Sequence, residues 1–392
     1  MRNPLSKKIV EIKPSGIRKF FDIVTEMNDP EVISLGVGEP DFDTPWHIRE
    51  EGIYSLEKGR TFYTSNAGLM ELRKEINNYL TRKCQVSYDP AHEIILTVGG
   101  SEAIDIALRA MLDPGDEVLI PQPSYVSYEP CTILADGVPV IINLKEENDF
   151  RLTKEEVLEA LTEKTKVLIL PFPNNPTGSV LRKKDLEEIA QVCIEHDIFV
   201  ISDEIYSELT YGEAKHVTIA SIPGMRERTI LINGFSKAFA MTGWRLGYAC
   251  GPGNIIQQMT KIHQFAIMCA PTSSQYAAVE ALKHGDQDVE MMRQSYDQRR
   301  RFLIKTFRDM GLHCFEPFGA FYIFPSIKNL GMTSDEFAAE LLKEEKVAVV
   351  PGTAFGDCGE GFLRISYAYS LEELKEATGR IARFVERRKK LL

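Results

Sequence analysis

The sequence contains no long apolar run, no paired cysteine motif and no excess of positive charge. No stretch approaches the roughly 18 apolar residues of a membrane span, and the opening MRNPLSKKIVEIKPSG lacks the apolar core of a signal peptide. The seven cysteines are odd in number and scattered, which argues against a disulfide framework or a zinc site and for a reducing compartment. We therefore expect a cytoplasmic protein that binds neither a membrane nor a metal.

An acidic balance of charge argues against a further class of partner. The formal net charge is -11, so the field of the protein repels polyphosphates, and the short basic runs at 299–301 and 387–390 fit solvated helix faces. No G-x-G-x-x-G follows an apolar run, so neither nucleic acid nor a dinucleotide is expected. The 392 residues, 44% of them hydrophobic, are enough for a soluble enzyme with one large core and a second, smaller one.

From about residue 93 the sequence alternates short apolar runs with amphipathic stretches of helical length. The predicted strands are 93–98, 118–121, 138–144, 166–172, 197–203, 228–234 and 245–251. This alternation predicts an α/β fold in which helices cover a parallel or mostly parallel sheet, with ligands at the carboxyl ends of the strands.

The two ends of the chain have a different pattern. Long charged helices are predicted at 284–310 and 371–391, with a strand at 319–327. We expect residues 1–50 and 286–392 to form one smaller α/β domain, and residues 51–285 to form the large domain.

Two loops after predicted strands could bind a ligand. VGGSEAI (98–104) leads a strand through two glycines into a helix, with Ser101 as the expected helix cap, and such a start exposes backbone N–H groups that can hold an anion. A plain turn explains the glycines equally well. In PNNPTG (173–178), Asn175 either forms an Asx-type turn or projects its amide into a site at the sheet edge.

Charged side chains end or interrupt three apolar strands. Asp203 in SDEIYSEL is either a cap or salt-bridge partner or a functional carboxylate, and Tyr206 follows one helical turn later. Lys237 follows the run TILIN with Arg245 nearby; desolvation and a second cation would free its amine, whereas the alternative is a snorkelling lysine beside a salt-bridge arginine. Arg364 in GFLRISYA is either an edge-strand charge or a carboxylate clamp.

In combination, these motifs resemble the class I, fold-type I aminotransferases, which depend on pyridoxal 5'-phosphate. The resemblance covers nearly the whole chain, through ISLGVGEPDFDTP (33–45), YTSNAGLMELR (63–73), VGGSEAI, PSYVSYEP (123–130), PNNPTG, SDEIYSEL, NGFSKAFAMTGWRLGY (233–248), GAFYIFP (319–325), PGTAFG (351–356) and GFLRISYA (361–368).

The resemblance implies a role for each matching residue around the cofactor ring. Lys237 would hold the cofactor as a Schiff base and carry the proton between the substrate and the cofactor, while Asp203 would pair with the ring nitrogen. Asn175 and Tyr206 would bond the phenolic oxygen, and Tyr125 would stack on the ring.

The resemblance also implies how the two ligands are held at their acidic ends. The cofactor phosphate would rest on backbone N–H groups around Gly100, Ser101 and Glu102, with donors from Ser236 and Arg245. Tyr63 would reach the phosphate of a neighbouring subunit, so a homodimer is implied. For the substrate carboxylate the expected contacts are Arg364, Gly38 and Asn175, and Phe355 would line the substrate pocket or serve the core.

The implied reaction is ping-pong transfer of an amino group from an amino acid to a 2-oxo acid such as 2-oxoglutarate. The strings SGIRKF, SDEIYSELTY and GAFYIFPSIKNLGMTS resemble the branch with aromatic, aspartate and N-acetyl-LL-diaminopimelate aminotransferases. We expect an aromatic or broad-range donor, aspartate included. The alternatives are the N-acetyl-LL-diaminopimelate enzyme of lysine biosynthesis and a C–S beta-lyase. No motif supplies the dedicated arginine that one aspartate branch uses, although Thr272, Ser273, Tyr276 and Arg18 are available.

Overall fold

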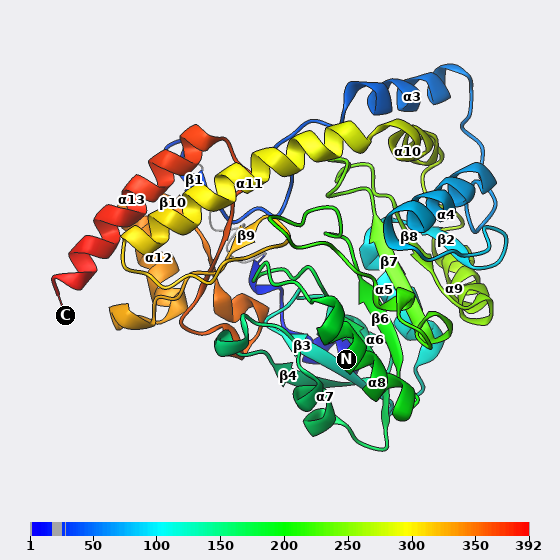
Figure 1. Ribbon diagram of the computed structural model, residues 1–392, viewed down its shortest axis with the longest axis horizontal. Helices are drawn as coiled ribbons and strands as arrows, with labels where there is room; N and C mark the ends of the chain where they lie inside the picture. The colour runs from blue at the N-terminus through cyan, green and yellow to red at the C-terminus, as the bar shows by residue number, and fades with distance from the viewer. Residues whose placement is uncertain (1, 18–25, 28, 392) are drawn as a thin grey trace.

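The computed structural model describes residues 2–17, 26–27 and 29–391, so Arg18 lies outside the described residues. Within these ranges the chain forms one seven-stranded sheet and, beside it, sheets of three and two strands (Figure 1). The large sheet has the order β2-β8-β7-β6-β5-β3-β4. Its strands are β2 (Ile94–Thr97), β3 (Glu117–Gln122), β4 (Val138–Asn143), β5 (Thr165–Leu170), β6 (Phe199–Asp203), β7 (Thr229–Gly234) and β8 (Gly247–Cys250).

The expectation of a mostly parallel sheet is confirmed. Only β8 runs antiparallel to its neighbours β2 and β7, and the other pairs are parallel. Along β5, Val167 and Ile169 pack into the core under α5 (Gly99–Met111) and α9 (Gly253–Ala266), whereas Leu168 and Leu170 pack into the core under α8 (Lys183–Glu195). Because both faces are covered, the strands are continuous apolar runs instead of alternating ones.

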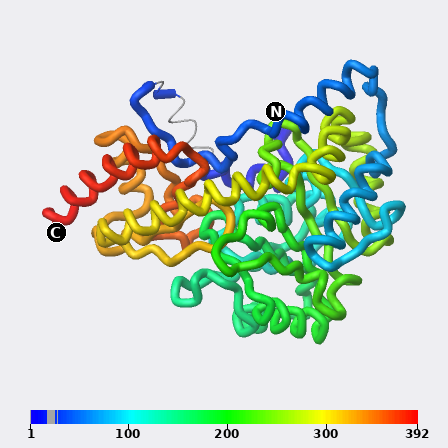
Figure 2. Tube along the Cα trace, turned by 45° about the horizontal axis from the view of Figure 1, so that its top comes forward, coloured from blue at the N-terminus to red at the C-terminus, as the bar shows by residue number. Residues whose placement is uncertain are grey.

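Helices surround this sheet and connect its strands. The first group comprises α4 (Met70–Cys84), α5 (Gly99–Met111), α6 (Tyr128–Leu134), α7 (Lys154–Ala160), α8 (Lys183–Glu195) and α9 (Gly253–Ala266), with the short helices α1 (Lys7–Glu11), η1 (Glu146–Asn148), η2 (Ile219–Ser221) and η3 (Arg226–Arg228). At the β2 end, α3 (Trp46–Glu57) packs against α10 (Thr272–His284), and the two lie side by side in both views (Figures 1 and 2). No helix in the described ranges is both long and apolar enough to cross a membrane.

The two-stranded sheet joins an N-terminal strand to a C-terminal one. β1 (Ile33–Ser34) pairs in parallel with β10 (Val347–Ala348). In the three-stranded sheet, β12 (Leu363–Ser366) lies between β11 (Val350–Pro351) and β9 (Tyr322–Ile323), antiparallel to both. The helices here are α12 (Ser334–Glu345), α13 (Leu371–Lys389), η4 (Lys328–Leu330), η5 (Gly352–Phe355) and η6 (Asp357–Gly359).

The strand predicted at 319–327 is far shorter than expected. Only Tyr322 and Ile323 form β9, because Ala320 has a left-handed φ of 57° that breaks the extended backbone. The backbone before it bonds to loops instead, with Ala320 N–H donating to Leu209 O at 2.9 Å.

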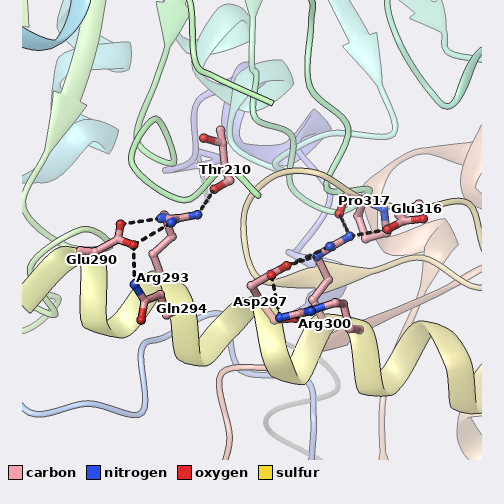
Figure 3. Close-up of polar contacts among 9 residues, drawn as sticks. Thr210, Glu290, Arg293, Gln294, Asp297, Arg300, Glu316 and Pro317 are labelled. Carbon is pink, nitrogen blue, oxygen red and sulfur yellow. Dashed lines mark hydrogen bonds and ion pairs between the residues drawn. The ribbon is translucent and has the colours of Figure 1, made fainter. Parts of the chain in front are cut away.

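The long helix α11 (Asp286–Asp309) links the small sheets to the large one through two arginines (Figure 3). Arg293 donates to Thr210 O at 3.1 Å, and Arg300 donates to Pro317 O at 3.1 Å. Arg293 also binds Glu290, and this hydrogen bond, followed by one from Gln294, lowers the pKa of Glu290 to about 2. The loop after β6, which contains Thr210, and the loop before β9, which contains Pro317, are therefore both attached to α11.

Candidate active site

A cavity of about 510 Å³ opens where β5, β6 and β7 end, as expected for a ligand site in a parallel sheet. Most of the residues predicted from the sequence line it: Gly38, Gly100, Ser101, Tyr125, Asn175, Asp203, Tyr206, Ser236, Lys237, Arg245 and Arg364. Glu102, Phe355 and Tyr63 do not line it.

One end of the cavity is the N-terminus of α5. The helix begins at Gly99 with Val98 as its N-cap, so the expectation that Ser101 caps the helix is wrong; Ser101 already lies in the first turn. The first N–H groups of a helix have no partner within it and can bind an anion. Gly99 has a φ of 75°, and a Cβ at this position would lie 2.6 Å from Nη2 of Arg245. Glycine at 99 thus lets the guanidinium approach the helix start.

The side chain of Glu102 faces a different neighbour. Its Oε2 accepts the Val98 N–H at 2.5 Å, and its Oε1 lies 2.6 Å from Nδ1 of the fully buried His263 on α9. The carboxylate of Glu102 therefore stabilises the start of α5, and only the backbone of Glu102 could contact a ligand in the cavity. His263 was not singled out in the sequence because it lies 161 residues from Glu102.

Lys237 follows β7 and points into the cavity. Its Nζ donates to Gly38 O at 2.6 Å. Burial lowers the pKa of Lys237 to about 8; Glu39 acts against this change, whereas Arg364 and Arg245 add to it. A substantial fraction of this amine is consequently neutral near pH 8 and able to act as a nucleophile.

Asp203 ends β6 and is buried, with 8% of its surface exposed. Tyr128 donates to its Oδ2 at 2.7 Å, and the Ile205 N–H donates to its Oδ1 at 3.2 Å. Burial raises the pKa of Asp203, while these hydrogen bonds oppose the rise. The carboxylate is thus held by a phenol and a backbone N–H, and a cationic ring nitrogen in the cavity would offset its desolvation.

Arg364 lies on β12, the middle strand of its sheet, so its interpretation as an edge-strand charge is wrong. The side chain is 1% exposed; it donates to Asn175 Oδ1 at 3.2 Å and also to Gly36 O. Its Nε is buried and has no hydrogen-bond partner among the described residues. A buried guanidinium with an unused donor fits a carboxylate ligand, because the anion would supply both the charge and the acceptor.

Phe355 and Tyr63 have other surroundings. Phe355 is buried, and the Cζ of Arg364 lies 4.8 Å from the centroid of its ring. Phe355 therefore contacts a cavity residue, Arg364, and does not line the cavity itself. Tyr63 is 80% exposed.

Several cavity residues were missed in the sequence. Tyr128 binds Asp203, and the hydroxyl of Tyr322 lies 2.8 Å from that of Tyr206. Glu39 accepts a hydrogen bond from Thr242 beside Lys237. The two tyrosines of PSYVSYEP, three residues apart, were the available signal for Tyr128.

These features fit pyridoxal 5'-phosphate. The free N–H groups of α5, with Ser236 and Arg245, suit a phosphate; the neutral fraction of Lys237 suits an aldehyde; and the buried Asp203 suits a protonated ring nitrogen.

Known proteins similar to this chain are aminotransferases. Residues 30–381 match the family model for class I and II aminotransferases. The chain is 52% identical to an aspartate aminotransferase of Pyrococcus abyssi and 46% identical to aromatic-amino-acid aminotransferase 2 of Thermococcus litoralis, with 98% of this chain and 99% of the relative covered in each case. It is 43% identical to a probable N-acetyl-LL-diaminopimelate aminotransferase of Bacillus subtilis, over 100% of this chain and 98% of the relative.

A solved structure extends this likeness to the backbone. The aromatic aminotransferase of Pyrococcus horikoshii superposes with a TM-score of 0.90 at 49% identity, covering 95% of this chain and 99% of that one. The chain therefore belongs to the class I and II aminotransferases and is an enzyme that uses pyridoxal 5'-phosphate to transfer amino groups.

Proposed function

We propose that this aminotransferase takes the amino group of an aromatic amino acid, or of a broad range including aspartate, and passes it to a 2-oxo acid such as 2-oxoglutarate. The observation that carries the proposal is the single cavity shared by Lys237 and Arg364. Lys237 supplies an amine with a pKa of about 8. Arg364 supplies a buried guanidinium whose Nε has no hydrogen-bond partner among the described residues. An amino acid needs both groups at once, because its nitrogen and its carboxylate are attached to the same carbon.

The cofactor, when bound, supplies an electron sink for the substrate carbon that loses its proton. Lys237 would hold the cofactor covalently, and its free amine would carry the proton as general base and acid. Asp203 would keep the ring nitrogen protonated, Asn175 and Tyr206 would bind the ring oxygen, and Tyr125 would stack on the ring. These roles are supported by the presence of all five side chains around one cavity.

The charged ends of the ligands would be held by separate groups. Gly100, Ser101 and Glu102 offer backbone N–H groups to the phosphate, with Ser236 and Arg245 adding side-chain donors. At the other end, Arg364 binds the substrate carboxylate together with Asn175 and the backbone at Gly38, while the ring of Phe355 packs against the guanidinium.

We also propose a homodimer in which Tyr63 reaches the phosphate of the neighbouring site. Support comes from the exposure of Phe62 (81%), Tyr63 (80%) and Phe265 (83%), since large aromatic side chains this exposed are typical of an interface. The Thr272 hydroxyl donates to Phe62 O at 2.8 Å and fixes this loop. A cytoplasmic location fits seven cysteines that are all free thiols.

The domain division remains a proposal, with 1–50 and 286–392 in the smaller domain and 51–285 in the large one. The pairing of β1 with β10 supports the union of the two ends. The first boundary falls within α3, which packs against α10 of the large domain.

The test is to purify the protein with its cofactor and follow the absorbance after adding single amino acids without an acceptor. Conversion of the yellow form by aromatic amino acids and aspartate, with release of the matching 2-oxo acid, would support the proposal. Preferential conversion by N-acetyl-LL-diaminopimelate would favour that enzyme, consistent with the 43% identical relative. Pyruvate and thiol from cystathionine would indicate a lyase. A Lys237→Ala variant should lose conversion even when the cofactor still binds, and unchanged turnover would contradict the proposed role of this lysine.

A further inference from the structure

Tyr322 contacts three separate parts of the active site. Its hydroxyl lies 2.8 Å from the hydroxyl of Tyr206, and the Cζ of Arg364 lies 4.7 Å from the centroid of its ring. A Cβ at Gly38 would collide with the Tyr322 hydroxyl, so only glycine leaves this hydroxyl its space. Tyr322 is 1% exposed and lines the cavity.

We propose that Tyr322 is a positioning residue that aims the Tyr206 hydroxyl at the cofactor and the Arg364 guanidinium at the substrate carboxylate. The inference rests on the proposed roles of Tyr206 and Arg364. It adds a shared support that connects the cofactor contact to the substrate contact.

The hydroxyl carries the first function. A phenol has one proton to donate and two lone pairs to accept with. If Tyr322 donates to Tyr206, the proton of Tyr206 is free for the ring oxygen of the cofactor. Because hydrogen bonds in a chain polarise one another, the bond from Tyr206 to the cofactor becomes stronger as well.

The aromatic ring carries the second function. Arg364 is enclosed by two rings, with Tyr322 at 4.7 Å and Phe355 at 4.8 Å from its Cζ. The negatively charged ring faces attract the guanidinium and fix its plane. Its unpaired Nε can then bind a carboxylate without first having to be ordered.

The backbone before Tyr322 explains how its position is set. Gly319 N–H donates to Gly178 O at 2.9 Å, just after the Asn175 loop, and Ala320 N–H donates to Leu209 O at 2.9 Å, just after Tyr206. Upstream, Arg300 on α11 binds Pro317 O (Figure 3). The segment that ends in Tyr322 is therefore attached to the loop that carries Asn175 and to the loop that carries Tyr206.

The experiment compares Tyr322→Phe, Tyr206→Phe and Tyr296→Phe holoenzymes by titrating the absorbance of the bound cofactor with pH. A hydrogen bond to the ring oxygen draws electron density away from the cofactor and lowers the pH at the midpoint of this titration. Loss of the Tyr206 hydroxyl should thus raise it, and Tyr322→Phe should raise it by a smaller amount, about half a pH unit. Tyr296 is the matched control, because it is fully buried in the neighbouring core and its hydroxyl has no hydrogen-bond partner among the described residues.

Kinetics separate the ring from the hydroxyl. Tyr322→Leu removes the face on which Arg364 rests and should raise KM for the amino acid by about five- to thirty-fold, whereas Tyr322→Phe should leave KM near that of the parent enzyme. A midpoint that Tyr322→Phe leaves unchanged while Tyr206→Phe shifts it would overturn the inference. If Tyr206→Phe also leaves the midpoint unchanged, the role proposed for Tyr206 is wrong and the inference falls with it.

Discussion

Tyr128 donates a 2.7 Å hydrogen bond to Asp203, and both residues are buried and line the cavity. The bond favours the charged carboxylate against a burial that raises its pKa. Tyr128→Phe should raise the pKa of Asp203 further and weaken the pairing that we propose between Asp203 and the ring nitrogen. Because a hydrogen bond to a charged group contributes about 1.5–3 kcal/mol, cofactor affinity should fall by about ten- to 150-fold. Equilibrium dialysis measures the affinity for the cofactor. Asp203→Asn should lower this affinity more than Tyr128→Phe does, and equal affinities of Tyr128→Phe and the parent enzyme would contradict the argument.

The pKa of about 8 at Lys237 predicts how the apoenzyme captures the cofactor aldehyde. Since only the neutral amine reacts, the rate of Schiff base formation should rise as pH increases through about 8 and then level off. Stopped-flow absorbance measures this profile. Glu39 raises the pKa of Lys237, so Glu39→Gln should move the midpoint to lower pH. A midpoint near the ordinary value of 10.5 would show that Lys237 is not desolvated in solution.

Gly99→Ala should displace the Arg245 guanidinium from the start of α5. The new Cβ would lie 2.6 Å from Nη2 of Arg245, and the left-handed φ of 75° adds strain. We expect cofactor affinity to fall by about tenfold, the value of one charge-assisted hydrogen bond. Gly59→Ala is the control for strain alone, because Gly59 has a φ of 67° and no atom of the described residues lies within 4 Å of an added Cβ. If both variants bind the cofactor equally well, the close approach of Arg245 has no role in binding.

His47 joins three helices in a pH-dependent way. Its ring nitrogens lie 2.8 Å from Glu280 on α10 and 3.0 Å from Asp288 on α11. Burial alone would lower the pKa of His47, but the hydrogen bonds to Asp288 and Glu280 outweigh it, and the net result is a raised pKa.

A raised pKa in the folded state contributes stability that is complete below the unfolded value of about 6.5 and is lost as pH rises through the folded pKa. His47→Gln should therefore destabilise the protein most below pH 6.5, by about 1 kcal/mol or less because solvent screens the pair. Denaturant unfolding across pH measures the difference. A loss that stays constant or grows with pH would contradict a cationic His47.

Much of the fold and site could be predicted because strand ends carry local signals. Asp203, Lys237 and Asn175 each follow a buried apolar run, and the carboxyl ends of parallel strands converge on one edge. Tyr322 could not be found in this way. Its role depends on the left-handed Ala320 before it and on backbone bonds to loops far away in the sequence. Ser101 failed as a cap for a similar reason, since the helix starts two residues earlier at Gly99, where only glycine accepts the backbone geometry.

The pairing of β1 with β10 also constrains the order in which the site can form during synthesis. Gly36 and Gly38, near the start of the chain, bind Arg364 and Lys237 through their carbonyls. The ribosome must therefore add 328 residues after Gly36 before the carbonyl of Gly36 can bind its partner Arg364. The large sheet can be in place by then, because β8 ends at Cys250, and Lys237 is then available to Gly38, whereas Gly36 still lacks Arg364. The proposed carboxylate site at Arg364 can thus be completed only after β12 has been synthesised.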